Sequence, residues 1–231
     1  MKIIILILSS LFTMIGLDTG HVCAAGDGHP VVYIDPHYGG RDNGPVVDKK
    51  NKGKEVTLNI AQAIQRELLI NQIKAYLSRD DDIFIPSGDR WFYAKKKGAD
   101  IYLSLRLSLQ DRDCVQIYYA KRQSTRNKSA TTEEAGKVVP NVPGDTTTKE
   151  SLMLADLVSN SLRNKEMSLC GTVNAKKDIV FETADFPAVI IEFGILHEAG
   201  QRSYVLDPAK IDAIAKSMAI AIKKFIEVQH N

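Results

Sequence analysis

The residues best suited to chemistry are a guanidinium and a carboxylate, Arg106 and Glu192, each at the carboxyl end of a predicted strand. Open α/β sheets place their binding sites at that end of the strands. A guanidinium binds a carboxylate through two parallel hydrogen bonds, and its charge favours the ionised form of the acid. We therefore expect Arg106 and Glu192 to pair in a cleft. The alternative is that Arg106 faces solvent without a partner.

Two histidines add candidate ligands or bases to this pair. His37 follows the first predicted strand, and His197 lies five residues after Glu192. An imidazole serves as a metal ligand or a general base. The simpler interpretations are a loop histidine bonded to backbone at position 37 and a polar cleft rim at position 197. The sequence has no glycine-rich phosphate loop and no Gly-x-Ser-x-Gly elbow, which removes two common enzyme classes.

Apolar runs that alternate with helical patterns supply the frame for these residues. Val56, Ile60, Ile64 and Leu68 recur every four residues, which predicts one buried helix face. Further helices are expected from Pro86 to Gly98, over residues 149–163 and from Pro208 onward, and strands over residues 31–34, 73–77, 100–107, 115–120, near 179 and over 188–191. The pattern predicts one α/β domain with a twisted, mostly parallel sheet of about six strands and helices on both faces.

Composition and the first residues bear on location and partners. The 231-residue chain is 44% hydrophobic and 25% charged, which excludes collagen-like and disordered classes, and its net charge of +2 argues against a nucleic acid partner. Residues 1–25 have the form of a signal peptide, with one lysine, an apolar block and small residues before Gly26. We expect export to the periplasm or the extracellular envelope, with no transmembrane anchor after cleavage. A retained amphipathic anchor is the alternative.

Residues 26–231 are expected to form the single mature domain. Residues 121–148, rich in Ser, Thr, Lys and Asn, predict a flexible loop, with a regulatory lid as the alternative. Cys114 and Cys170 remain after cleavage, and they either form a disulfide or stay as buried thiols. Neither has the spacing of a zinc site.

Several segments resemble the zinc-dependent N-acetylmuramoyl-L-alanine amidases of bacterial cell walls. That family has Asp-Pro-Gly-His-Gly-Gly after its first strand, and residues 35–40 read Asp-Pro-His-Tyr-Gly-Gly. Residues 78–80 (Ser-Arg-Asp), the segment from Arg90 to Asp100, and residues 186–194 (Phe-Pro-Ala-Val-Ile-Ile-Glu-Phe-Gly) match further family motifs in the same order. The resemblance runs from Val31 to Phe225 and implies the amidase fold.

The same resemblance implies a zinc ion held by two histidines and a glutamate, with a second glutamate near the bound water. Only that second glutamate is kept, as Glu192; the three ligand positions fall on Tyr38, Gly53 and Arg106. Small shifts of register would bring His37 or Glu55 into use, but a guanidinium has no lone pair for a metal. We therefore expect no metal and no other cofactor, with Arg106 in the volume of the cation.

Three functions follow as hypotheses. The first is an exported, zinc-less pseudoenzyme that binds peptidoglycan or an envelope protein through Arg106, Tyr38, His37 and His197, with Glu192 at the position of the family's general base. The second is a working amidase that cleaves the lactyl–L-alanine amide with a metal site rebuilt from His37, Glu55 or His197. The third is an export-apparatus or structural envelope component that reuses the scaffold.

Overall fold

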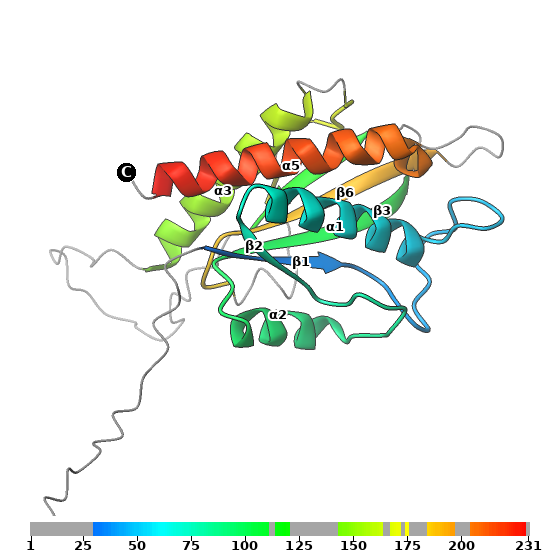
Figure 1. The fold of residues 1–231 in the computed structure, drawn as a ribbon, viewed down its shortest axis with the longest axis horizontal. Helices are drawn as coiled ribbons and strands as arrows, with labels where there is room; N and C mark the ends of the chain where they lie inside the picture. The colour runs from blue at the N-terminus through cyan, green and yellow to red at the C-terminus, as the bar shows by residue number, and fades with distance from the viewer. Residues whose placement is uncertain are drawn as a thin grey trace, which may run out of the picture.

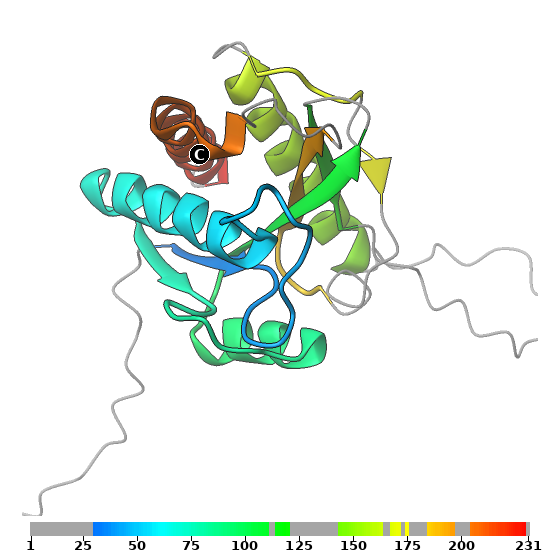
Figure 2. The same cartoon turned by 90° about the vertical axis from the view of Figure 1, so that its right-hand side faces the viewer.

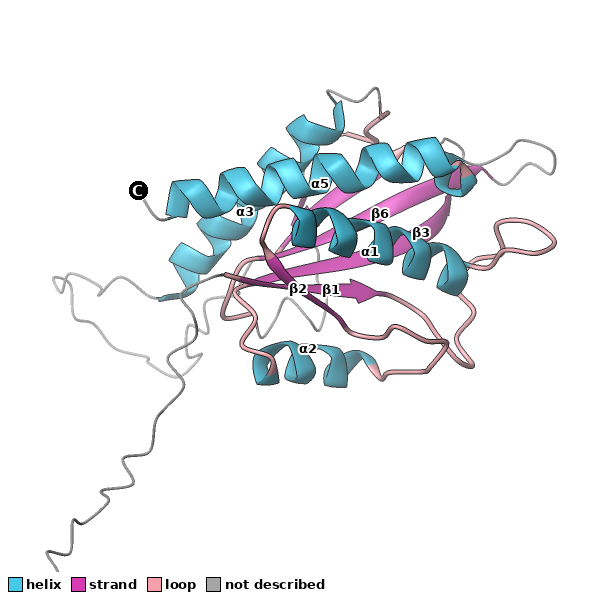
Figure 3. Ribbon diagram, in the orientation of Figure 1, coloured by secondary structure: helices cyan, strands magenta, loops and turns pink. Residues whose placement is uncertain are grey.

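The sheet of this protein has six strands in the order β2-β1-β3-β6-β4-β5 (Figure 1). In the computed structural model, the described residues are 30–110, 114–120, 143–163, 167–171, 174–175, 184–196 and 204–229. The strands are β1 Val31–Pro36, β2 Lys74–Leu77, β3 Ile101–Gln110, β4 Val115–Tyr119, β5 Asn174–Ala175 and β6 Ala188–Leu196. The helices are α1 Gly53–Ile70, α2 Ser87–Lys96, α3 Pro143–Arg163, the short 3₁₀ helix Tyr204–Leu206 and α5 Pro208–Gln229 (Figure 3).

All paired neighbours in the sheet run parallel except β4, which is antiparallel to β6. This confirms the predicted single α/β domain with a mostly parallel sheet. Among the helices in the described ranges, none is both long and apolar enough to cross a membrane.

The two faces of the sheet are covered unequally. Alternate residues of β3 point to opposite faces, so Leu103 and Leu105 join the large core that α1, α3 and α5 complete. Tyr102 joins a smaller cluster on the other face, where Trp91 of α2 packs against it. Figure 2 shows α2 on the opposite side of the sheet from α1 and α5. Helices therefore lie on both faces, as expected, but the α2 face carries much the thinner cover.

Several boundaries differ from the predictions. β3 and β6 each continue well past the predicted ends, because the alternation of apolar and polar side chains continues through Leu107–Gln110 and the apolar run through Phe193 and Ile195. Helix α3 begins at Pro143, so the last part of the expected loop 121–148 is helical. Residues 1–29, 121–142 and the expected strand near 179 lie outside the described residues.

The two mature cysteines are joined: Cys114 and Cys170 form a disulfide. Sequence reasoning had left this open. The bond ties the start of β4 to the segment after α3, where the Cys170 N–H donates to the Val115 carbonyl at 3.0 Å. The neighbouring Cys114 carbonyl in turn accepts from the Gly194 N–H of β6 at 2.7 Å. The disulfide therefore holds a loop against the end of the strand that carries Glu192.

Replacing both cysteines with serine, C114S/C170S, is expected to lower the free energy of unfolding by about 2–4 kcal/mol, because the bond closes a loop of 56 residues. Urea denaturation of the oxidised protein, the reduced protein and the double variant measures this. Equal midpoints for all three would contradict a structural role for the bond.

Candidate functional site

Two charged side chains lie next to each other across the centre of the sheet. In the parallel pairing of β3 with β6, Arg106 stands opposite Glu192, and Gln116 of β4 stands opposite Glu192 on the other side. Residues in register share one face, so these three side chains form a row across β3, β6 and β4. All three are half-buried. The row lies on the face that carries α2, since Tyr102 and Ser104 precede Arg106 at alternate positions.

This placement corrects one expectation. Arg106 and Glu192 are not at the carboxyl ends of their strands but inside them, four residues before each strand ends. They therefore project from the face of the sheet. The physical reason is the longer strand pairing, which runs through Gln110 and Leu196.

A buried carboxylate, Asp35 at the end of β1, organises the residues around this row. It accepts hydrogen bonds from Arg90 of α2 and from Ser78 after β2, and the Tyr102 hydroxyl donates to it at 3.0 Å. Ser104 links the two groups: its hydroxyl lies 3.4 Å from Asp35 Oδ2, and Arg106 Nε donates to it at 3.2 Å. Burial alone raises the pKa of Asp35, but His37, the Arg90 guanidinium and Ser78 outweigh it and hold that pKa well below its ordinary value.

Tyr38 lies beside the row in a backbone conformation that few side chains adopt. Its φ is 67°, and its hydroxyl donates to the Leu107 carbonyl at 2.7 Å. A Cβ on Gly44 would meet the Tyr38 ring at 2.7 Å, and one on Gly53 would lie 3.2 Å from its Cε2. The ring is therefore packed directly against two positions that lack a side chain.

The charges of Arg106 and Glu192 act on the Tyr38 hydroxyl. Burial raises the pKa of Tyr38; the hydrogen bond to Leu107 and the positive charge of Arg106 lower it, and the negative charge of Glu192 raises it. The net shift is upward, so the phenol stays protonated at neutral pH and continues to donate to Leu107. The pKa of Tyr118 in β4 is also raised, first by burial and then by the negative charge of Glu192.

The His37 ring is turned toward Asp35. Its Nδ1 lies 3.8 Å from Asp35 Oδ2, and its ring meets the Tyr38 ring edge-on with centroids 4.8 Å apart. Its backbone is fixed as well, because its N–H donates to the Leu105 carbonyl and its own carbonyl accepts from Thr57. The buried Nδ1 has no hydrogen-bond partner among the described residues.

The residues at the expected metal position do not fit a zinc ion. Tyr38 uses its hydroxyl on the backbone, Gly53 has no side chain, and Arg106 is a cation. The substitute ligand Glu55 accepts from the Lys52 N–H at the start of α1, at 2.9 Å, and so caps that helix. His197 lies outside the described residues. Within the described ranges, no group of three or more His, Cys, Asp or Glu side chains is placed to hold a metal.

The register places Arg106 beside Glu192, and Tyr38 and His37 lie near them. The ion pair between Arg106 and Glu192 stays a prediction. The structure adds Gln116 and Tyr118, which the sequence had not indicated, because only the antiparallel pairing of β4 with β6 places them beside Glu192. It also adds the buried Asp35–Arg90 pair. An aspartate directly after an apolar strand was the available signal for that pair.

Known proteins share both the sequence pattern and the fold of this chain. A family model described as N-acetylmuramoyl-L-alanine amidase matches residues 32–224. The chain is 22% identical over 219 residues to the amidase AmiC of Neisseria meningitidis, a match that covers 85% of this chain and 53% of that protein. It is 24% identical to a putative amidase of Buchnera aphidicola, covering 84% of this chain and 95% of that protein. The chain thus spans about half the length of the Neisseria relative.

Solved structures give the same fold. The amidase AmiC2 of Nostoc punctiforme aligns with a TM-score of 0.68 at 21% identity, covering 87% of this chain and 99% of that chain. The CwlD amidase of Clostridioides difficile, solved in complex with the GerS lipoprotein, aligns with a TM-score of 0.63 at 18% identity, covering 87% of this chain and all of that one (100%). At these identities the likeness concerns the fold.

Replacing Asp35 with asparagine is expected to lower the free energy of unfolding at pH 7 by about 3–5 kcal/mol, because it leaves the buried Arg90 guanidinium without its counter-charge. Since the pKa of Asp35 is lower in the folded protein, the stability that it contributes is present above the ordinary carboxyl pKa. That stability is lost progressively as the pH falls below about 5.

Urea denaturation of wild type and D35N between pH 7 and pH 3 tests this expectation. The difference in stability between the two proteins should narrow as the pH falls. A difference that stays constant over the range would show that the carboxylate charge does not stabilise the fold.

Proposed function

Because this chain belongs to the N-acetylmuramoyl-L-alanine amidase family, we propose that it is an exported, zinc-less member that binds peptidoglycan or an envelope protein. The observation that carries the proposal is the register of β3 on β6, which sets a guanidinium beside Glu192 where the family resemblance implies a histidine. The binding group is Arg106, with Glu192, Tyr38 and His37 around it. His197 is a further candidate from sequence.

Electrostatics argue against zinc at this position. A unit positive charge about 4 Å from a divalent cation costs roughly 8 kcal/mol at an effective dielectric of about 20. A complete structural zinc site supplies about 10–16 kcal/mol, and this site lacks the ligands that provide it. The repulsion therefore removes half or more of the gain that even an intact ligand set would give.

The packing of Tyr38 points the same way. A glutamate at position 53 would start from a Cβ that already lies 3.2 Å from the Tyr38 ring. The phenol ring and the missing side chain are therefore complementary, as a large residue and a small one are in a packed core. Tyr38 and Gly53 are therefore compatible with each other, because the tyrosine ring occupies the space that a side chain at position 53 would need.

A guanidinium held in this way suits an anionic group of a ligand. Arg106 Nε is occupied by Ser104, which orients the guanidinium without neutralising it. A carboxylate of a peptidoglycan stem peptide, or of an acidic protein segment, is the matching chemistry. A structural neighbour, the CwlD amidase, is known in complex with the GerS lipoprotein. The disulfide and the expected signal peptide at residues 1–25 support export to an oxidising compartment.

Sedimentation with purified sacculi tests the proposal. The wild-type protein should co-sediment with peptidoglycan without releasing soluble fragments from dye-labelled material. R106Q should weaken binding at least about ten-fold, since a charge-assisted hydrogen bond contributes about 1.5–3 kcal/mol. The matched control is R66Q, on the exposed surface of α1, which should bind as wild type does. A stem peptide with a free carboxylate should compete, and its amide should not.

Two results would overturn this function. Release of dye that a chelator abolishes would identify a working amidase with a metal site rebuilt around His37. The second result has two parts: the wild-type protein does not bind sacculi, and it captures no envelope protein whose binding R106Q abolishes. Together these would contradict the proposed binding role.

A further inference from the structure

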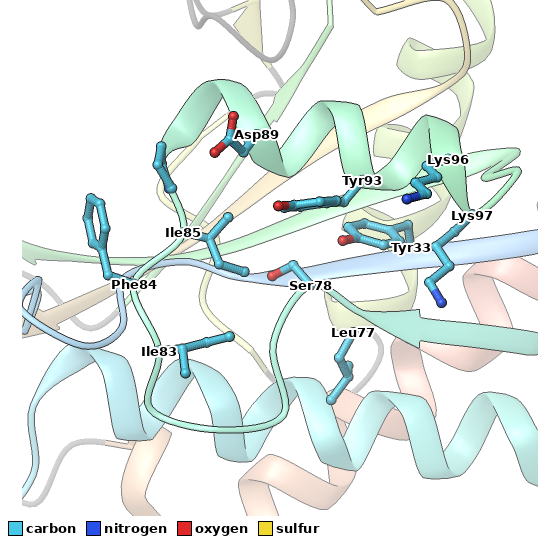
Figure 4. A pocket seen from close by; sticks show the side chains of 11 residues that line it. Tyr33, Leu77, Ser78, Ile83, Phe84, Ile85, Asp89, Tyr93, Lys96 and Lys97 are labelled. Atoms are coloured by element: carbon cyan, nitrogen blue, oxygen red, sulfur yellow. The ribbon is translucent and has the colours of Figure 1, made fainter.

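A second hollow lies on the α2 side of the molecule, away from the Arg106–Glu192 row. It has a volume of about 540 Å³, within the range of small-ligand sites. Its walls come from β1, the end of β2, the segment after it and α2 (Figure 4). The side chains that line it are those of Tyr33, Leu77, Ser78, Ile83, Phe84, Ile85, Pro86, Asp89, Tyr93, Lys96 and Lys97. None of the residues in the row contributes to it.

The rim of this pocket exposes apolar side chains that are close together. Ile83 is 50% exposed, Phe84 39% and Tyr93 42%, and Phe92 next to them is 61% exposed. Single exposed apolar residues are normal, but a cluster around a concavity marks a surface that another molecule covers. The walls accept a branched or aromatic side chain.

The floor of the pocket carries a tyrosine hydroxyl that has no hydrogen-bond partner among the described residues. Tyr33 is 2% exposed, and its hydroxyl makes no hydrogen bond within the described part of the chain. Figure 4 shows the hydroxyls of Tyr33, Tyr93 and Ser78 turned to the same side of the pocket. Burial and then the charge of Asp35 raise the pKa of Tyr33, so its hydroxyl remains a donor. A ligand carbonyl is the acceptor that such a donor lacks.

The charge at one end of the pocket is positive. Lys96 and Lys97 lie where α2 ends, and Lys96 makes no ion pair with any described residue. Lys97 Nζ lies 5.0 Å from the centroid of the Tyr76 ring, whereas Lys95, outside the pocket, is paired with Asp185 at 2.6 Å. Asp89 marks the opposite end. An anionic group at the lysine end and a backbone N–H near Asp89 complement this distribution.

We propose that this pocket binds a partner polypeptide through a bulky apolar side chain with a carboxylate next to it. The apolar walls take the side chain, Tyr33 donates to its backbone carbonyl, and Lys96 and Lys97 bind the carboxylate. A glycan fits less well, because the buried Tyr33 ring offers almost no open face for stacking and Arg41 already lies 4.3 Å over the Phe84 ring. The inference is independent of the Arg106 site.

Nuclear magnetic resonance titration of the full protein tests the pocket with three probes: N-acetyl-L-phenylalanine, its amide, and N-acetylglucosamine. The acid should shift the backbone amide signals of Tyr93 and Lys96, and it should bind about two- to five-fold more tightly than the amide. In K96M/K97M that preference should disappear. The control K224M, on the exposed surface of α5, should keep it.

A second variant tests the floor of the pocket. Y33F removes only a hydroxyl that makes no hydrogen bond within the described residues, so the thermal midpoint should stay unchanged. Its affinity for the acid and for the amide should fall by a similar factor, since both probes carry the acetyl carbonyl. In R106Q the shifts of the Tyr93 and Lys96 signals should match those of the wild type with every probe, which separates failure of this pocket from failure of the proposed function.

Three results would overturn the inference. The first is the absence of shifts at the pocket up to the solubility limit of the acid. The second is a stronger response to the sugar than to the acid, which would identify a glycan site. The third is an acid preference that survives in K96M/K97M.

Discussion

The register between β3 and β6 is the constraint from which the site of this protein follows. Nine consecutive residue pairs, from Tyr102 with Ala188 to Gln110 with Leu196, fix these central strands against each other. A shift by one residue would turn every side chain of β3 to the other face and bury polar groups in the main core. Arg106 therefore cannot leave the neighbourhood of Glu192 without unfolding the sheet. The register therefore keeps a guanidinium and a carboxylate side by side on one face of the sheet.

The buried carboxylate of Asp35 connects the elements that surround the row. Asp35 joins β1 to α2 through Arg90, to the end of β2 through Ser78, and to β3 through Tyr102. Ser104 extends the same network to Arg106. The network thus runs from the buried Arg90 and Asp35, through Ser104, to the half-buried Arg106. The interactions that hold the fold and those that orient the candidate binding group belong to one network.

Sequence patterns predicted the elements well where apolar periodicity was strong. The buried stripe Val56–Leu68 and the start of α5 at Pro208 are as expected. Strand ends were less predictable, because pairing with a neighbour extends a strand beyond its apolar run, as at Arg106 and Glu192. Within the site, Gln116 was out of reach of sequence reasoning, since it depends on which strand lies next to β6 and in which direction. The same holds for the α2 pocket, which only the packing of a helix on an edge strand creates.

The central claim is that a guanidinium has taken the place of the metal in this amidase-family fold. Calorimetric titration of the purified oxidised protein with Zn²⁺ at neutral pH tests it most directly, with E192Q titrated in parallel. The account predicts no stoichiometric binding by the wild type and the same weak background for both proteins. One equivalent of tightly bound zinc that is lost in E192Q would contradict it.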